Sequence, residues 1–359
     1  MRRWRWCACR SRCAASGRYR QQPLPRCTRR ASACCRSTRA IDLNRSVDLN
    51  SAVAPRACCT RGCSAGVLAV QLESNELNSE YVFTLSCPDR LGIVALVSDV
   101  FYRNGAFITE VSNYSDQQSR RFFLRFVFDD RQLGCTIEEF GAHLARLAAE
   151  LDLDYRFRPL AARQRVLIAV SKYDHCLNVL LNRWKSGVLP IDVTGVVSNH
   201  ADCRSLVEWY GIPYHHFPVS RETRHEQEQQ ILDLMRAERV DLLVLARYMQ
   251  ILSDGMCRQL AGRAINIHHS FLPGFKGAKP YHQAYERGVK VIGATAHYVT
   301  SDLDEGPIIV QEVKRIDHQV SVEQMVHMGH DTESTALAEA VRLHVTERVV
   351  LNGQRTVIL

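Results

Sequence analysis

Three short, mostly apolar runs limit most strongly how this chain can fold. They are Val166–Val170, Val193–Val197 and Leu242–Ala246. Runs of this kind fit strands that are buried on both faces of a parallel sheet. Segments with helical spacing lie between them, at Leu177–Lys185, Cys203–Trp209 and Glu226–Ala237. This alternation predicts an α/β domain over residues 165–359 with a mostly parallel, Rossmann-like sheet, whose ligands bind at the carboxyl ends of the strands.

The end of the chain continues this domain. A helical pattern covers Ser321–Val350, and the pair Asn352-Gly353 that follows is a typical helix stop. We therefore expect one long helix over this range and a terminal strand at Thr356–Leu359.

A different order of elements precedes residue 165. The pattern predicts a strand at Tyr81–Ser86, a helix at Leu91–Tyr102, strands at Ala106–Tyr114 and Arg121–Phe128, a helix at Ile137–Leu151 and a strand at Asp154–Pro159. The order βαββαβ predicts an α+β ferredoxin-like unit over residues 80–161, joined to the following domain by a short junction.

One segment of this first unit resembles the ACT domain family. It reads Ser86-Cys-Pro-Asp-Arg-Leu-Gly-Ile-Val94 and is followed by the helix stop Asn104-Gly105. The resemblance covers residues 81–160 and implies a regulatory domain that assembles chains into a homo-oligomer and binds small effectors, often amino acids. It implies that Asp89, Asn104 and Ala106 lie near an effector, with glycine and methionine as the first candidates. The alternatives are a unit that only mediates assembly, and an Asp89 that only caps the helix.

The basic residues of the chain are concentrated at its start. Residues 1–76 contain 15 arginines, no lysine and four acidic residues, a net charge of +11. The whole chain carries +8, so the remaining residues carry −3. This distribution argues against a nucleic-acid binder, which would be basic over its folded part.

The same stretch holds most of the cysteines. Nine of the 14 lie within residues 1–63, without a paired CxxC motif or a histidine partner, which disfavours a zinc module. We expect residues 1–76 to be an unfolded basic extension: a transit peptide, a disordered tail or a mis-assigned start. No apolar run reaches the ~20 residues of a membrane span. We therefore expect a cytoplasmic protein with no membrane partner, or a mitochondrial one if the extension is a genuine transit peptide.

The first candidate catalytic residues lie in the stretch Ala264-Ile-Asn-Ile-His-His-Ser-Phe-Leu-Pro-Gly274. Strand alternation places Asn266 and His268 on the same face, two residues apart. An amide can donate a hydrogen bond to an oxyanion, and an imidazole, which titrates near neutral pH, can hold or donate a proton. Such a pair is suited to work on a carbonyl group.

A second stretch completes the pattern: Gly293-Ala-Thr-Ala-His-Tyr-Val-Thr-Ser-Asp-Leu-Asp-Glu-Gly-Pro-Ile-Ile-Val-Gln311. Together the two motifs resemble the folate-dependent formyltransferase family over residues 165–359. The resemblance implies that Asn266, His268 and Asp304 are catalytic and that His297 supports them. It also implies a folate pocket formed by Met249, Gln250, Ile251, Leu252, Thr300, Ser301, Asp302 and Leu303.

These residue types fit attack on an N-formyl group. The amide of Asn266 and a protonated His268 would stabilise the tetrahedral oxyanion, and Asp304 would accept the proton of the nucleophile. The chemistry needs no metal, and the sequence has no HExxH or similar signature. We expect no metal and no cofactor, with 10-formyltetrahydrofolate as the substrate.

The segment after the first strand of the domain bears on the formyl acceptor. It reads Val170-Ser-Lys-Tyr-Asp-His-Cys-Leu177 and lacks the glycines with which backbone amides wrap a phosphate. Asp174 would also repel one. Water remains as the acceptor, which predicts hydrolysis to formate and tetrahydrofolate, supplying formate for purine synthesis and balancing the one-carbon pool. The alternatives are formylation of glycinamide ribonucleotide and a non-catalytic sensor of folate and amino acids.

Overall fold

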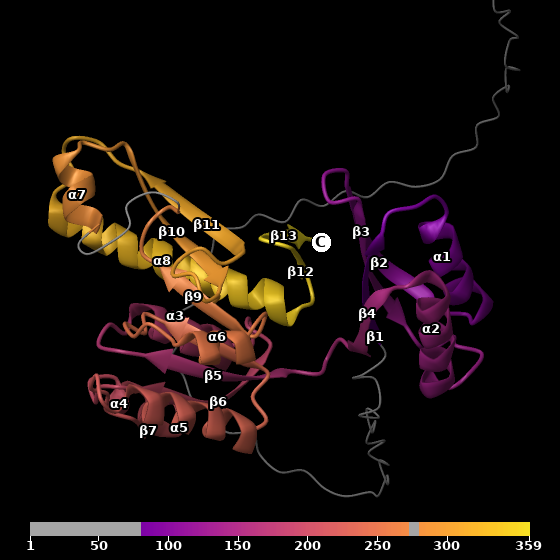
Figure 1. Cartoon of the computed structure of the whole chain (residues 1–359), viewed down its shortest axis with the longest axis horizontal. Coiled ribbons are helices and arrows are strands. Elements are labelled where there is room, and N and C mark those ends of the chain that lie inside the picture. The colour runs from indigo at the N-terminus through magenta and orange to yellow at the C-terminus, as the bar shows by residue number, and fades with distance from the viewer. Residues whose placement is uncertain (1–79, 273–279) are drawn as a thin grey trace, which may run out of the picture. The chain divides into compact units, whose positions relative to one another are not determined.

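The computed structural model describes residues 80–272 and 280–359, so the expectation for residues 1–76 falls outside the described residues. It contains a four-stranded sheet, a seven-stranded sheet and a C-terminal two-stranded hairpin. Figure 1 shows each large sheet with helices packed on it. No helix of the described ranges is long and apolar enough to cross a membrane.

The first described unit has the order βαββαβ that the sequence predicts. Its elements are β1 (Glu80–Pro88), α1 (Ile93–Arg103), β2 (Phe107–Asp116), β3 (Arg121–Asp129), α2 (Ile137–Leu151) and β4 (Asp154–Pro159). The strands pair antiparallel in the order β2-β3-β1-β4. Phe101 of α1 lies edge-on to Phe126, Phe128 and Phe140, which joins the two helices to the sheet through one aromatic core.

The ends of the two helices follow different rules. Thr136 and Glu139 form a complete capping box at the start of α2. The N-cap of α1 is Gly92, in the left-handed conformation with φ 92° and without a side-chain cap. Asp89 instead accepts a hydrogen bond from Ser115 Oγ. The alternative interpretation of Asp89 as the cap of this helix is therefore wrong.

The second described unit is the predicted α/β domain. Its first eight elements are β5 (Gln164–Val170), α3 (His175–Lys185), β6 (Ile191–Ser198), α4 (Arg204–Trp209), β7 (Tyr214–His216), α5 (Arg224–Ala237), β8 (Leu242–Ala246) and α6 (Asp254–Gln259). The remaining elements are β9 (Ala264–His268), α7 (Pro280–Glu286), β10 (Val291–Tyr298), β11 (Ile308–Arg315) and α8 (Val322–Val345), followed by β12 (Val349–Asn352) and β13 (Arg355–Ile358).

The large sheet has the strand order β11-β10-β9-β8-β5-β6-β7. The five strands from β9 to β7 are parallel, and β10 runs antiparallel to both β9 and β11. One core cluster joins a face of the sheet to α3 and α8, and another joins the opposite face to α5 and α6. The sheet is thus mostly parallel and covered on both faces.

The expectation for the C-terminal helix was wrong at its end. The helix α8 ends at Val345, not Val350, and Glu347 takes a left-handed conformation with φ 54°. Residues 349–352 pair with residues 355–358 in the hairpin β12–β13. Asn352-Gly353 is the turn of this hairpin rather than a helix stop, because this dipeptide suits tight turns between strands and valines favour extended backbone.

Candidate active site

A cavity of about 250 Å³ lies at the carboxyl ends of β8 and β9. Every residue that the sequence predicts for catalysis or folate contact lines it: Asn266, His268, His297, Asp304, Met249, Gln250, Ile251, Leu252, Thr300, Ser301, Asp302 and Leu303. The sequence did not predict the other lining residues, which are Leu245, Arg247, Tyr248, Cys257, Ile267, His269 and Val299. The one available signal for Arg247 is its position directly after a buried strand, at the edge where ligands bind.

The pairing of β9 with β10 places Asn266 beside His297. The two residues are direct cross-strand partners, and Asn266 Nδ2 lies 3.3 Å from His297 Nε2. His297 Nδ1 lies 2.9 Å from the carbonyl oxygen of Tyr298 and must carry the proton of that hydrogen bond. His297 Nε2 is therefore the acceptor for one N–H of Asn266. This contact fixes the amide and leaves its second N–H for a ligand.

Asp304 reaches the site from the loop after β10. Its backbone is left-handed, with φ 58°, and Tyr298 N donates to Pro307 O at 2.9 Å across the base of the loop. A Cβ at Gly306 would lie 1.7 Å from the carbonyl oxygen of Tyr298, so only glycine fits there. The Asp-Glu-Gly-Pro sequence therefore folds the loop back, and Asp304 Oδ1 lies 3.2 Å from His268 Nδ1.

The ionisable groups around His268 differ in their charge at neutral pH. Burial raises the pKa of Asp304, but the hydrogen bond from His268 and the nearby imidazoles lower it more, so the net shift is downward. Burial lowers the pKa of His297, and burial together with Arg247 and His268 lowers the pKa of His269 to about 4. At neutral pH, Asp304 is therefore ionised and the two flanking imidazoles are neutral.

Two residues that line the cavity have a buried polar atom without a hydrogen bond in the described ranges: Arg247 Nε, which has an ion-pair partner in Glu333 at 3.3 Å, and His268 Nε2. His268 Nε2 is buried and makes no hydrogen bond with any residue in the ranges 80–272 and 280–359. A buried polar group without a partner is costly unless a ligand or water satisfies it. Since Nδ1 of the same ring faces Asp304, Nε2 is the atom left to meet a substrate.

The predicted folate loop is fastened to α5. Arg224 donates to the carbonyl oxygen of Ile251, and Glu228 accepts from Ser253 N at 2.7 Å. Met249 and Ile251 keep 54% and 59% of their surface exposed beside the cavity. The loop therefore offers apolar side chains and backbone groups on a fixed frame, which suits a flat, partly polar ring.

The predicted effector residues do not meet within one chain. Asp89 lines a shallow cleft at the start of α1, directly after the carboxyl end of β1. Asn104 donates to the carbonyl oxygen of Val100, and it and Ala106 precede β2 at the other end of the unit. Phe107, the first residue of β2, pairs with Asp129, and Asp129 pairs with Glu80, the first residue of β1. The start of β2 therefore lies at the same end of the sheet as the start of β1, whereas Asp89 follows the end of β1.

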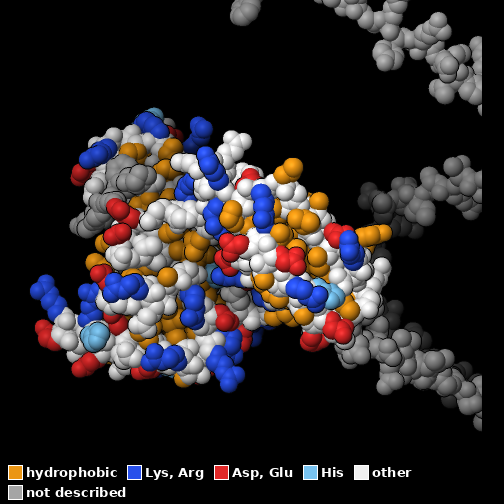
Figure 2. Space-filling model, turned by 45° about the vertical axis from the view of Figure 1, so that its right-hand side comes forward, with side chains coloured by type: hydrophobic (Ala, Val, Ile, Leu, Met, Phe, Trp, Pro, Cys, Tyr) orange, Lys and Arg blue, Asp and Glu red, His pale blue; other side chains and the backbone are white. Residues whose placement is uncertain are grey.

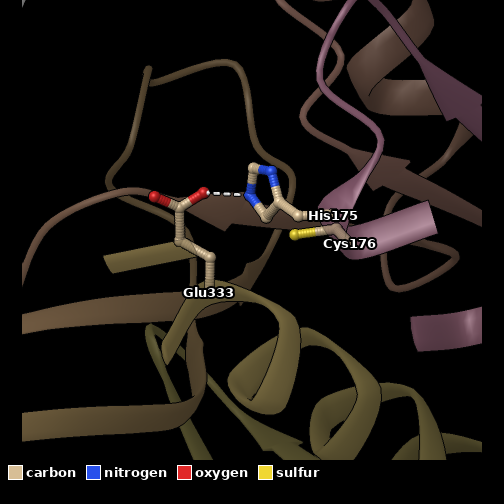
Figure 3. Close-up of side chains that lie close together, drawn as sticks. All are labelled: His175, Cys176 and Glu333. Carbon is tan, nitrogen blue, oxygen red and sulfur yellow. Dashed lines mark hydrogen bonds and ion pairs between the residues drawn. The ribbon is translucent and has the colours of Figure 1, made fainter. Parts of the chain in front are cut away.

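One group of side chains in the described ranges could hold a metal ion. His175, Cys176 and Glu333 offer ligand atoms within 4.8 Å of one another. Figure 3 shows Glu333 projecting from α8 toward His175 at the start of α3. The carboxylate already has three partners: His175 Nε2 at 2.8 Å, Arg247 Nε at 3.3 Å and the Tyr281 hydroxyl at 2.7 Å. Burial also raises the pKa of the Cys176 thiol, which disfavours the metal-binding thiolate. We interpret the group as part of an ion-pair network.

Comparison with known proteins identifies relatives of this chain. Residues 164–341 match the formyl transferase family. A formyltetrahydrofolate deformylase from Corynebacterium sp. (strain P-1) is 50% identical over 279 residues, which make up 78% of this chain and 98% of that protein.

Solved structures give the same result. A formyltetrahydrofolate deformylase from Burkholderia mallei is 48% identical with a TM-score of 0.75, covering 78% of this chain and 99% of that one. A glycinamide ribonucleotide transformylase from Symbiobacterium toebii is more distant: it is 32% identical with a TM-score of 0.51, covering 55% of this chain and 94% of that one.

Proposed function

Because this chain belongs to the formyltetrahydrofolate deformylase family, we propose that it hydrolyses 10-formyltetrahydrofolate to formate and tetrahydrofolate. The observation that carries the proposal is the arrangement of Asn266, His268 and Asp304 around one cavity, in which Nδ1 of His268 faces the Asp304 carboxylate and Nε2 of the same ring has no partner among the described residues. The formate would serve purine synthesis and balance the one-carbon pool in the cytoplasm.

Each of the three side chains has a separate task in this mechanism. A water molecule attacks the formyl carbon, and Asp304 accepts its proton. Asn266 Nδ2 and His268 Nε2 donate to the oxygen of the formyl group, where negative charge develops. The tetrahedral intermediate then loses N10 of the folate, which takes up a proton, and formate leaves. The mechanism uses no metal and no cofactor.

The folate is expected to enter between two loops. Residues 249–252 and 300–303 line the same cavity as the catalytic side chains, and Leu303 adds a further exposed apolar side chain there. We propose that backbone groups of these loops recognise the pterin ring. His297 acts as a positioning residue, since it accepts a hydrogen bond from Asn266 and its other nitrogen is engaged by the backbone.

The direct test measures both products. Purified full-length protein is incubated with 10-formyltetrahydrofolate, and formate and tetrahydrofolate are quantified with and without glycinamide ribonucleotide. We expect equal amounts of formate and tetrahydrofolate in both cases. Formation of tetrahydrofolate only when glycinamide ribonucleotide is present would identify a transferase, and no turnover in either case would identify a folate-binding sensor.

We further propose that the βαββαβ unit is an ACT domain that assembles the chain and binds an amino acid. Its edge strand β2 exposes Phe107, Val111 and Tyr114, which suits pairing with a second copy. Basic and acidic side chains are interspersed on the face shown in Figure 2, which gives no support to a nucleic-acid partner.

An effector would appear as a change in turnover. We expect glycine or methionine to change the apparent affinity for folate by roughly 5–150-fold, the usual range of coupling between two sites. The measurement is a steady-state assay against all twenty amino acids, repeated with Asp89→Ala and Asn104→Ala. A flat response to every amino acid would leave assembly as the only role of the unit.

A further inference from the structure

We call the side of the cavity formed by the folate loop, residues 249–252, the folate side, and the side formed by Arg247 the opposite side. The folate loop is tied to α5, which covers one face of the sheet. Arg247 lies two residues before this loop, but its side chain pairs with Glu333 of α8, a helix that covers the other face together with α3. Attack on a formyl group held on the folate side would then come from the side on which Arg247 and α3 lie.

That opposite side is filled by the protein itself. We define the Glu333 network as His175, Arg247, Tyr281 and Glu333. Glu333 is fully buried, and the side chain of Arg247 is only 10% exposed. Arg247 lines the catalytic cavity beside His268, and its guanidinium lies over the ring of Tyr173, 5.4 Å from the centroid. The network therefore occupies the ends of β5 and β8, next to the reacting group.

The backbone of Arg247 has a conformation that favours glycine. Its φ is 62°, in the left-handed region that glycine enters freely and that costs other residues energy. Glycine therefore suits the backbone at this position, so Arg247→Gly removes the side chain without straining the chain.

The Glu333 network also pairs the positive charge of Arg247 with a carboxylate of the protein. Burial raises the pKa of Glu333, but the hydrogen bond from His175 and the charge of Arg247 lower it more, so the net shift is downward and the carboxylate is ionised. The charge of Arg247 is thereby balanced within the protein. A buried guanidinium without such a partner would attract a phosphate or carboxylate group.

We propose that Arg247, held by Glu333, is the residue that restricts the nucleophile to water. Its side chain lies in the cavity wall beside His268, where a larger acceptor would need space, and its charge is paired with that of Glu333. This inference rests on the proposed hydrolysis, because it explains why the formyl group passes to water. It adds that removing one side chain turns part of the hydrolysis into formyl transfer.

The transfer reaction balances without a further reactant. The nitrogen of an amine forms a bond to the formyl carbon, the bond between that carbon and N10 breaks, and a proton from the amine passes through Asp304 to N10. The products are an N-formyl amine and tetrahydrofolate. Glycinamide is a suitable probe, since it is a small amine that is clearly larger than water.

The test compares two arginine-to-glycine variants at left-handed positions. Arg247→Gly opens the space at the cavity, and its backbone conformation suits glycine. Arg239→Gly is the matched control, because Arg239 also has a positive φ, 49°, and is exposed between α5 and β8. Formate, tetrahydrofolate and N-formylglycinamide are measured at increasing glycinamide concentrations.

We expect formate to equal tetrahydrofolate in the wild type and in Arg239→Gly at every glycinamide concentration. In Arg247→Gly, N-formylglycinamide should account for on the order of a tenth of the tetrahydrofolate, since a bound amine competes with water through proximity. Equal formate and tetrahydrofolate in an active Arg247→Gly variant would overturn the inference. So would a folded variant without any turnover, because Arg247 would then serve the reaction itself.

A second variant covers the case in which Arg247→Gly does not fold. Removing both partners of a buried ion pair is tolerated better than removing one. The double variant Arg247→Gly/Glu333→Gln keeps amide hydrogen-bonding groups near His175 and Tyr281, and the same product ratio decides the inference. A wild-type protein that releases no formate would refute the proposed function instead, which the first measurement of the series reveals.

Discussion

The Asp304→Asn variant is expected to fold and to lose ~100–10,000-fold in kcat, the usual range for a general base. Asparagine keeps the size of the side chain and its hydrogen bond to His268, but it cannot accept the proton of water. Asp304 lies 3.2 Å from His268 and its pKa is shifted downward, so the group that this variant removes is a carboxylate ready to act as a base. The measurement is kcat from formate release, with folding checked by circular dichroism.

The matched control is Asp233→Asn, which changes an exposed carboxylate on α5 and should leave kcat unchanged. The pH profile gives a second check. Because the pKa of Asp304 is lowered, its carboxylate stays ionised as the pH falls and is lost only below the ordinary range of aspartate. The acid limb of kcat should therefore lie at low pH in the wild type. An Asp304→Asn variant that keeps more than about a tenth of kcat would exclude the base role.

Most of the order of the secondary structure could be predicted because it depends on local pattern, whereas the short elements β7, α6 and α7 were not predicted. Apolar runs such as Val166–Val170 fall inside buried strands, and the amphipathic run Ile137–Leu151 is a helix with the same bounds. The end of α8 could not be predicted in this way. Asn352-Gly353 is compatible with both a helix stop and a hairpin turn, and only the pairing of β12 with β13 decides between them.

The candidate site likewise contains residues that local motifs predict and residues that they do not. Asn266, His268 and Asp304 lie within two continuous motifs, so their proximity follows from a short strand and one loop. The Glu333 network draws its members from four separate segments, and no local pattern predicts that they meet. Glu333 stands in the polar run His330-Asp331-Thr332-Glu333-Ser334-Thr335, so nothing in its local sequence marks it as buried.

His268→Ala is expected to lower kcat by about 1,000-fold, the upper end of the range for loss of an oxyanion-hole donor. The loss should be this large because the substitution also removes the partner of Asp304. His268 Nε2 is buried without a partner among the described residues, so a substrate oxygen is the group that would satisfy it. His318→Ala, which removes an exposed imidazole, is the control and should retain full activity.

The double variant Asn266→Ala/His268→Ala tests whether the two donors act on one oxygen. Asn266→Ala alone should cost about 100-fold, since it removes one oxyanion donor. If both side chains stabilise the same developing charge, the double variant should be little worse than His268→Ala, because groups that act as a unit do not contribute additively. Losses that multiply would show two independent roles. In that case Asn266 would position the folate, and the arrangement of β9 and β10 would serve binding rather than the oxyanion.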